Sequence, residues 1–484
     1  MKSLGGLTSS FRLLDDCRYN REIRAGIWIF ILAGLIRTVF SICSYLALGR
    51  EGLMGPDSHA FLLSAQFLAA GGGVFDSLPD HTMGGGFPRD FMPIAFWLMA
   101  LTIEPTGLAE PLTFVLIQGW IDAASCLLIA LMAAQLRFDA FVPAGILAAL
   151  NPTQIIIASQ VYADTIFLFF CLLTLLGGLM WFYHGNWLST GIIGIGFAFA
   201  LLTRPFILYW LPVLAVLMIA GWAWLNRQNT GRALLQVCCI VIIVSAAMSP
   251  ILLRNYSDFG RLALHAQTGS HLLFWVVPLV QESVDGTPRA VSKARGDELY
   301  ETWPGPMPPE NRPFLTSNRL SEIARSELAR IGHIHVAAAW VKGMIVNLLA
   351  PASSVTPIVR ALPHDSFFEM KAESFFDKIV RFINQPHALL YSSILIISGL
   401  LMPFWLMLAV WGLTELLRKG RIHSVNALFL FIWCGYTLGV AGPVISPKYR
   451  LPLEGVWVVF TVIGFLIIRD LFIRHGSKKH GRTD

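Results

Sequence analysis

Long apolar runs separated by short polar loops dominate the hydropathy pattern of this chain. A helix needs about 20 mostly apolar residues to cross a bilayer, and several runs reach or approach that length. The runs expected to cross are 25–48, 111–136, 138–159, 165–183, 192–203, 206–225, 233–253, 387–417, 425–444 and 457–468. The pattern predicts an all-α integral membrane protein, a bundle of about ten or more transmembrane helices.

Two further apolar runs, 91–103 and 337–349, are too short to span a bilayer, and Lys342 interrupts the second. We expect 91–103 to form a juxtamembrane or re-entrant helix on the outer side, and 337–349 to form a segment that lies on the membrane. Counting the second as a span would also place the later loops on the wrong side of the membrane.

One long hydrophilic segment is expected to form an external loop with helices of its own. Within it, Leu320, Ile323, Leu328 and Ile331 recur at helical spacing, which predicts an amphipathic helix on the membrane surface or on the bundle. The chain then divides into three parts. These are an N-terminal transmembrane catalytic module (1–254) with a first external loop (49–110), the long external loop (255–386), and C-terminal helices with a basic tail (387–484).

Basic residues cluster in alternate loops, which indicates the topology. Arg18, Arg21 and Arg24 precede the first span, and cytoplasmic loops are enriched in Lys and Arg. With both termini in the cytoplasm, the later basic clusters also fall on that side. They are Arg227 with Arg232, Arg418 with Lys419 and Arg421, and Arg474, Lys478, Lys479 and Arg482 in the tail. We expect a multi-pass protein of the plasma (inner) membrane.

The composition agrees with this topology. Hydrophobic residues make up 55% of the 484 and charged residues only 14%, which excludes an ordinary soluble protein. The seven cysteines lie mostly within apolar runs, so we infer neither a disulfide framework nor a thiolate metal site. The net charge of +6 is spread over short loops and the tail, which argues against nucleic acid as a partner.

The stretch Gly55-Pro56-Asp57-Ser58-His59 directly follows the first span. A Gly-Pro turn there would hold a carboxylate where a membrane-embedded donor meets an acceptor in water. We interpret Asp57 as a candidate catalytic base. The alternative is that Asp57 only caps a helix beginning at Ser58, since Asp is a favoured N-cap residue.

Several ionisable residues from distant parts of the chain fall at the outer ends of the expected spans. Basic residues are disfavoured on that side, so they need a counter-charge, and a phosphate fits because Arg binds it bidentately and Lys as a point charge. The alternative is pairing with Asp164, Asp258 or Glu454, or contact with lipid headgroups. The outer-face set is Asp57, Asp164, Arg204, Arg254, Lys448 and Arg450.

Other ionisable residues carry less weight. Asp122, inside an expected span, is given a structural role, bonding to a neighbouring helix. His265, His271, His333 and His335 lack the spacing of established metal motifs, so we predict no metal and no cofactor.

Five short segments occur in an order known from one group of membrane enzymes. They are Asp57 with an aromatic four residues on (Phe61) and alanine eight on (Ala65), then Asn151-Pro152 with Ser159 and Tyr162-Ala163-Asp164, then Ala200-Leu201-Leu202-Thr203-Arg204-Pro205, then Pro250 through Gly260, then Tyr449-Arg450-Leu451-Pro452. Together they resemble the GT-C superfamily of membrane glycosyltransferases, in the branch of the protein O-mannosyltransferases and lipid A aminoarabinose transferases. This chain departs from the pattern in two places, with Ser58 where many members have a second acid and Phe61 where tyrosine is usual.

The resemblance implies a sugar donor linked to a polyprenyl phosphate and an acceptor that attacks on the external face with inversion. Direct displacement needs a carboxylate to take the acceptor proton and cations to hold the leaving phosphate. Asp57 is then the base, and Asp164 assists it. The donor-phosphate candidates are Arg204, Arg254, Lys448 and Arg450.

Such a site has two entrances. The lipid tail would lie between spans near 91–103, and the acceptor, a lipid, glycan or protein, would enter beneath the long external loop. The acceptor or lid candidates are His59, His265 and His271, with the segment 265–281 as the lid.

Two other functions remain open. A lipid-linked sugar transporter or flippase also needs charges among its spans, although no inverted repeat is evident here. A ligase or polymerase of polyprenyl-linked glycans would use the same carrier but join preassembled glycans.

Overall fold

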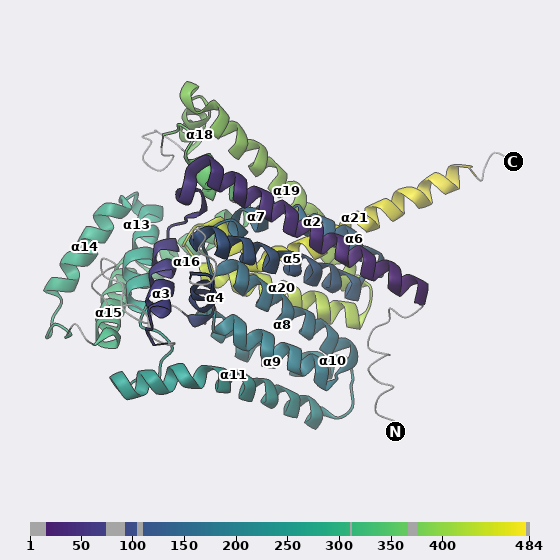
Figure 1. Ribbon diagram of the computed structural model, residues 1–484, viewed down its shortest axis with the longest axis horizontal. Helices are drawn as coiled ribbons and strands as arrows, with labels where there is room; N and C mark the ends of the chain where they lie inside the picture. Colours follow the sequence, from purple (N-terminus) through teal and green to yellow (C-terminus); the bar gives the residue numbers. More distant parts are fainter. Residues whose placement is uncertain (1–15, 74–91, 104–109, 310–311, 366–374, 481–484) are drawn as a thin grey trace.

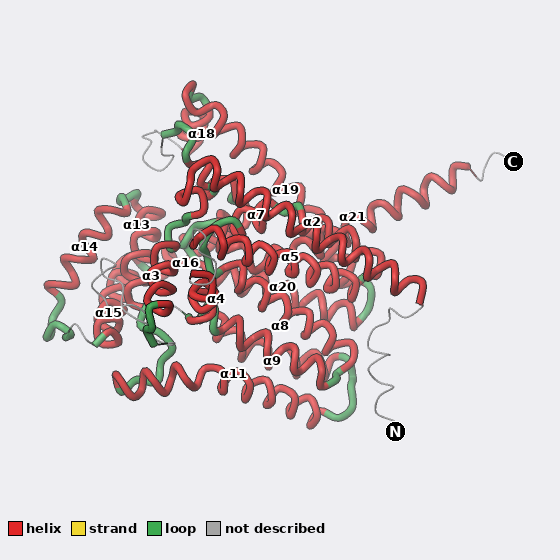
Figure 2. The backbone as a smooth tube through the Cα atoms, in the orientation of Figure 1, coloured by secondary structure: helices red, strands yellow, loops and turns green. Residues whose placement is uncertain are grey.

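The structure is a computed structural model that describes residues 16–73, 92–103, 110–309, 312–365 and 375–480. Within these ranges the chain forms helices and no strands, and Figure 2 shows helices joined by loops. Eight of the described helices are long and apolar enough to cross a membrane, or up to ten if each of two bent helix pairs is one span. The prediction of an all-α, multi-pass membrane protein is confirmed.

The long helices lie side by side across Figure 1, with α2 against α5, α8 against α9, and α19 against α21. The beginning of α2 and the end of α21 lie at the same end of this bundle, opposite α13–α16 (Figure 1). The long helices are α2 (Asp16–Leu48), α5 (Glu110–Leu136), α8 (Asp164–His184), α11 (Thr230–Phe259), α19 (Leu389–Arg418), α20 (Arg421–Ala441) and α21 (Leu451–His480). The eighth candidate span, Pro205–Trp224, consists of a short 3₁₀ helix followed by α10 (Trp210–Trp224).

The expected crossing at 192–203 is α9 (Trp187–Leu201), which has 15 residues and is shorter than a full span. The apolar run 91–103 forms α4 (Pro93–Ile103). Short helices connect the bundle. They are η1 (Gly49–Leu53), α3 (Ser58–Ala69), η4 (Pro205–Tyr209), η7 (Pro386–Ala388) and η8 (Pro447–Arg450). The expected first external loop (49–110) lies partly outside the described residues.

The run 138–159 does not form the single straight span that we expected. It consists of η3 (Phe138–Ala140), α6 (Phe141–Ala149) and α7 (Pro152–Ala158), with a 50° bend between the last two. Pro152 has no N–H to continue α6 but suits the first position of a new helix. The Asn151 side chain caps that helix by accepting from the N–H groups of Thr153 and Gln154.

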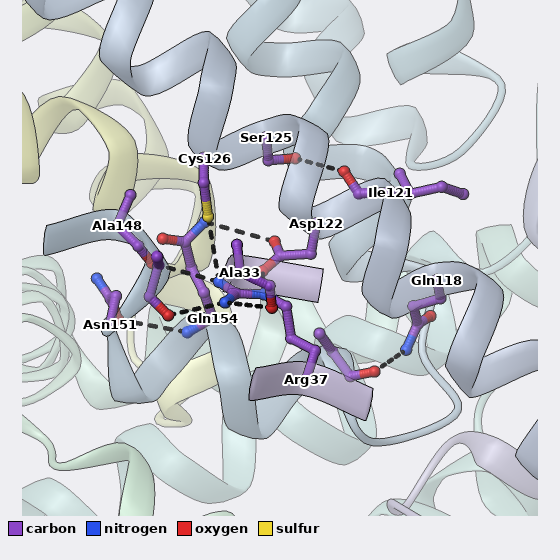
Figure 3. Close-up of polar contacts among 12 residues, drawn as sticks. Ala33, Arg37, Gln118, Ile121, Asp122, Ser125, Cys126, Ala148, Asn151 and Gln154 are labelled. Carbon is purple, nitrogen blue, oxygen red and sulfur yellow. Dashed lines mark hydrogen bonds and ion pairs between the residues drawn. The ribbon is translucent and has the colours of Figure 1, made fainter. Parts of the chain in front are cut away.

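A fully buried ion pair stabilises this break from one side (Figure 3). Arg37 Nε on α2 donates to Asp122 Oδ2 on α5 over 2.6 Å, and Arg37 Nη1 donates to the Ala149 carbonyl at 2.8 Å. Arg37 Nη2 reaches the Ala148 carbonyl at 3.3 Å. The guanidinium thus satisfies carbonyls at the end of α6 that have no water to bond. The structural role predicted for Asp122 is confirmed.

The long hydrophilic segment folds into helices at one end of the bundle (Figure 1). The predicted amphipathic helix is α15, which buries Leu320 and Ile323. A 101° bend separates α15 from α16, the apolar run expected to lie on the membrane. The helices here are α12 (Thr268–His271), η5 (Leu272–Val276), α13 (Val277–Asp285), α14 (Arg289–Thr302), α15 (Pro313–Ile331), α16 (His333–Leu349), η6 (Ala352–Val355), α17 (Pro357–Arg360) and α18 (Phe375–Ile383).

Candidate functional site

Asp57 occupies the N-cap position of α3, but its side chain makes no capping hydrogen bond. Its Oδ2 instead accepts from Lys448 Nζ at 2.5 Å. Lys448 lies in η8, just before the last span, and its side chain is 11% exposed. The Asp57 carboxylate thus faces a buried cation from the other end of the sequence and makes no cap bond, and its role as the base stays a prediction.

The turn that carries Asp57 is clamped to the loop before α8. Ser58 Oγ accepts from the Gly55 N–H at 2.7 Å and donates to the Val161 carbonyl at 2.8 Å. A side chain at Gly55 has no room, since a Cβ atom there would lie 2.0 Å from the hydroxyl oxygen of Tyr162. Ser58, which stands where the resembling enzymes often have a second acid, is fully buried and has this structural task.

The Gly55→Ala variant is expected to be destabilised by about 1–3 kcal/mol, because the added methyl forces the turn away from Tyr162. Thermal unfolding in detergent would measure the change. Gly231→Ala is the matched control, since nothing lies within 4 Å of a Cβ at that position. Equal stability of the two variants would contradict the close packing of turn and loop.

A second ion pair joins two elements of the same region. Arg204 follows α9, and its Nη2 donates to Asp164 Oδ2 at 2.5 Å, at the start of α8. The backbone N–H of Arg204 closes the end of α9 on the Ala200 carbonyl, and Pro205 begins η4, so the residue has a fixed position. Arg204 Nε is buried, and no hydrogen-bond acceptor within the described ranges reaches it.

The two pairs form one electrostatic group. Burial alone would raise the pKa of Asp57, but the Lys448 and Arg204 cations outweigh it and hold that pKa below its usual value. Burial alone would lower the pKa of Arg204, but Asp164 and then Asp57 raise it. Each cation is thus shared between two carboxylates. The group of Asp57, Asp164, Arg204 and Lys448 is formally neutral.

Two tyrosines enclose the lysine. The Lys448 ammonium lies 5.1 Å from the centroid of the Tyr162 ring and 5.3 Å from that of Tyr449, within the range of cation–π attraction. Burial is the main cause that raises the pKa of Tyr162, so this phenol stays neutral. In the sequence both tyrosines belong to the motifs, but no role was predicted for either. Tyr162 is two residues before Asp164 and Tyr449 directly follows Lys448, and this closeness in sequence could have indicated that they lie near the charged group.

Arg450, also expected to bind the donor phosphate, has its contacts outside this group. It is fully buried, with Nε donating to Glu454 at 2.6 Å, Nη2 to Thr153 Oγ1 at 2.9 Å, and Nη1 to the Ala350 carbonyl at 2.7 Å. Asn151 completes the arrangement by donating to Glu454 at 2.9 Å. All three nitrogens of Arg450 are occupied within the protein, which favours a structural role, and its role in binding the donor phosphate stays a prediction.

The remaining candidates lie in three places. Arg254 is on α11, and its guanidinium donates to Asn255 Oδ1 at 3.1 and 2.9 Å. His59 is exposed on α3, two residues after Asp57. His265 and His271 lie at the beginning of the expected lid. Desolvation and then Lys448 lower the pKa of His271, while burial and then His271 lower that of His265.

The imidazole of His271 therefore lies within electrostatic reach of Lys448, and both histidines stay neutral near pH 7. Within the described ranges, no three His, Cys, Asp or Glu side chains gather as they would around a metal ion. The expectation that the protein uses neither metal nor cofactor stays a prediction. The roles of Arg254, His59, His265 and His271 also stay predictions.

No protein-family model and no curated protein matches the sequence. Solved structures do match the fold. The archaeal oligosaccharyltransferase AglB from Archaeoglobus fulgidus, in complex with an inhibitory peptide and a dolichol-phosphate, is 12% identical over 95% of this chain and 52% of its own, with a TM-score of 0.52. Its apo form is 14% identical over 94% of this chain and 52% of its own, again with a TM-score of 0.52.

The chain thus spans about half the length of AglB. ArnT from Cupriavidus metallidurans, bound to undecaprenyl phosphate, is 15% identical over 90% of this chain and 76% of its own, with a TM-score of 0.38. The chain therefore shares the membrane fold of AglB, which agrees with the all-α bundle expected from its sequence.

Proposed function

We propose that this protein is a membrane glycosyltransferase that moves a sugar from a polyprenyl-phosphate-linked donor to an acceptor on the external face, with inversion at the anomeric carbon. The observation that carries the proposal is the neutral group of two carboxylates and two cations at one end of a GT-C bundle. The dolichol-phosphate in the AglB complex supports a lipid-phosphate donor for this fold.

Arg204 and Lys448 are the residues that would hold the donor phosphate. Buried donors without partners are costly, and Arg204 Nε is such a donor. A phosphate oxygen would satisfy it, while the compact Lys448 ammonium supplies a second positive charge. Arg254 stays a candidate for the same task from α11. The lipid tail would then leave the site along α4, whose Leu101 is 71% exposed.

Donor binding would also prepare the base. In the unliganded protein the Asp57 carboxylate is neutralised by Lys448, which makes it a weak base. A phosphate that takes Lys448 and Arg204 frees Asp57 and raises its basicity. The acceptor oxygen then bonds to the anomeric carbon as the bond from that carbon to the phosphate oxygen breaks. Asp57 takes the acceptor proton, and the polyprenyl phosphate leaves with the bonding electron pair.

The distribution of charge supports the external side for this chemistry. The ends of α5, α10 and α19 lie opposite α13–α16 in Figure 1, and the loops there are basic. Cytoplasmic loops are enriched in Lys and Arg, which favours cytoplasmic termini in the plasma (inner) membrane and an external site. The basic loop residues are Arg137, Arg227, Arg232, Arg418, Lys419 and Arg421.

The acceptor would approach beneath the lid that begins at His265 and His271. Their neutral imidazoles can orient an acceptor hydroxyl without competing for the phosphate. His59 is a further candidate for contact with the acceptor. Whether the acceptor is a lipid, a glycan or a protein is a question for experiment.

Transfer from a panel of radiolabelled polyprenyl-phosphate sugars in proteoliposomes tests the proposal. A glycosyltransferase of single sugars is expected to release polyprenyl phosphate and to label an acceptor from a one-sugar donor. A requirement for longer glycans would favour a ligase or polymerase. Movement of intact lipid-linked sugar across the bilayer, without transfer from any donor, would replace the proposal with a transporter or flippase.

A further inference from the structure

A cavity of about 230 Å³ lies at the end of the bundle away from Asp57. The ends of α5 and α19 and one face of α21 form its lining. Along α21, the rise from Leu451, three residues after Lys448, to Asp470 is about 30 Å. Asp470 is the ion-pair partner of Arg137, which lines the cavity. The cavity is therefore separate from the candidate site.

The charged lining residues fall into two groups. Arg137 belongs to a closed ring, because it pairs with Asp139 and Asp470 at 2.6 Å each, and Arg469 pairs with the same two carboxylates at 3.0 and 2.9 Å. Two cations and two anions balance in this ring.

The second group is Arg418, Lys419 and Glu415, with two positive charges against one. Arg418 Nη1 lies 3.4 Å from Glu415 Oε1, and the Arg418 side chain is 76% exposed. Such a pair is weak, so most of the guanidinium stays accessible to another anion. The cavity thus has surplus positive charge on its α19 side.

The remaining lining residues of the cavity are apolar. They are Leu416 and Ile463, which are buried, and Ile467. Near the end of α19, two large apolar side chains are exposed, Trp411 at 45% and Leu417 at 37%. Exposed tryptophans near the ends of spans typically lie at the headgroup level of the bilayer.

We propose that this cavity binds the phosphate of an anionic membrane lipid. The phosphate would lie against Arg418 and Lys419, the glycerol region would fill the cavity beside Leu416 and Ile463, and the acyl chains would follow α19. Basic pockets between helices at the cytoplasmic surface commonly hold such headgroups. Since free phosphate offers the same charge without the chains, the test separates the two sources.

The test is titration of the purified full chain, in phosphatidylcholine micelles, with phosphatidylglycerol, with more phosphatidylcholine, or with inorganic phosphate, followed by thermal unfolding. Only phosphatidylglycerol is expected to raise the melting temperature of the wild type. The Arg418→Gln/Lys419→Gln variant is expected to bind it about 30-fold more weakly, since two cations near the surface are lost. Ile467→Phe, which fills the cavity without changing charge, should weaken binding as well.

Arg232→Gln is the control, because it removes an exposed cation near the beginning of α11, outside the cavity lining. It should behave as the wild type. An unchanged response of the double variant, an equal effect of phosphatidylcholine, or full stabilisation by inorganic phosphate would each overturn the proposal.

Discussion

Replacing Asp57 by Asn is expected to lower the rate of sugar transfer by about 10²–10⁴-fold, the usual contribution of a general base. The substitution keeps the shape of the side chain and removes its ability to accept the acceptor proton. Because Lys448 and Arg204 remain, donor binding should be retained or strengthened. Single-turnover transfer in proteoliposomes, with donor binding measured separately, would check both parts.

Asp297→Asn provides the control, since Asp297 is an exposed carboxylate on α14 in the same end of the molecule. Its rate should equal that of the wild type. The pH profile of kcat/KM gives a second readout, because it reports groups of the free enzyme. Lys448 and Arg204 hold the pKa of Asp57 below the ordinary carboxyl value of about 3.9. The acid limb of the kcat/KM profile should therefore lie at a pH below that value.

Activity is lost as the pH falls through this pKa, since protonated Asp57 cannot act as a base. In Lys448→Met the acid limb of the kcat/KM profile should move to higher pH. Burial raises the pKa of Asp57, and this variant lacks the lysine cation that lowers it. An Asp57→Asn enzyme with full transfer activity would eliminate this residue as the base.

The Arg450→Gln variant is expected to lose about 3–5 kcal/mol of stability, because it leaves the Glu454 carboxylate buried beside an uncharged group. It also removes donors from the carbonyls of Leu348 and Ala350 and from Thr153. If Arg450 held the donor phosphate, the main effect would be a raised KM with unchanged stability. Thermal unfolding and donor titration on the same preparation distinguish the two roles.

Two variants sharpen this test. Arg450→Gln/Glu454→Gln removes both charges and should be more stable than Arg450→Gln alone, since no unpaired carboxylate remains.

The control variant is Arg232→Gln, because Arg232 is exposed. Arg227→Gln is a poor control, because the Arg227 guanidinium donates to the carbonyls of Phe182 and Tyr183. Wild-type stability of Arg450→Gln would refute the structural role.

The hydropathy pattern located the membrane helices well because each long helix must cover its own backbone polar groups in an apolar medium. Run 111–136 coincides with the candidate span Pro111–Leu136. The pattern did not show the break at Asn151, because both halves of that run are apolar. The Asn-Pro pair was visible in the sequence, but the carbonyls freed by the break are satisfied by Arg37, 111 and 112 residues away.

The candidate site was harder to predict in detail. Topology indicated which charges share one face, and Asp57, Asp164, Arg204 and Lys448 do meet there. The same reasoning placed Arg450 with them, because Arg450 is only two residues from Lys448 in the sequence. In the structure its side chain lies in a different environment. In a short helix, such neighbours point in different directions, and only the surrounding packing decides which one faces the cluster. Arg37 was overlooked because one cation hardly changes the mean hydropathy of its run.

The ion pair between Asp57 and Lys448 joins residues 391 positions apart in the chain. Since a ribosome makes the N-terminal residues first, every other member of the neutral group is synthesised before Lys448. A nascent or truncated chain that stops short of η8 would hold Asp57, Asp164 and Arg204 with an unbalanced negative charge. Such a chain should repel the phosphate of a lipid carrier, so catalytic competence would arise only when the final helix enters the membrane.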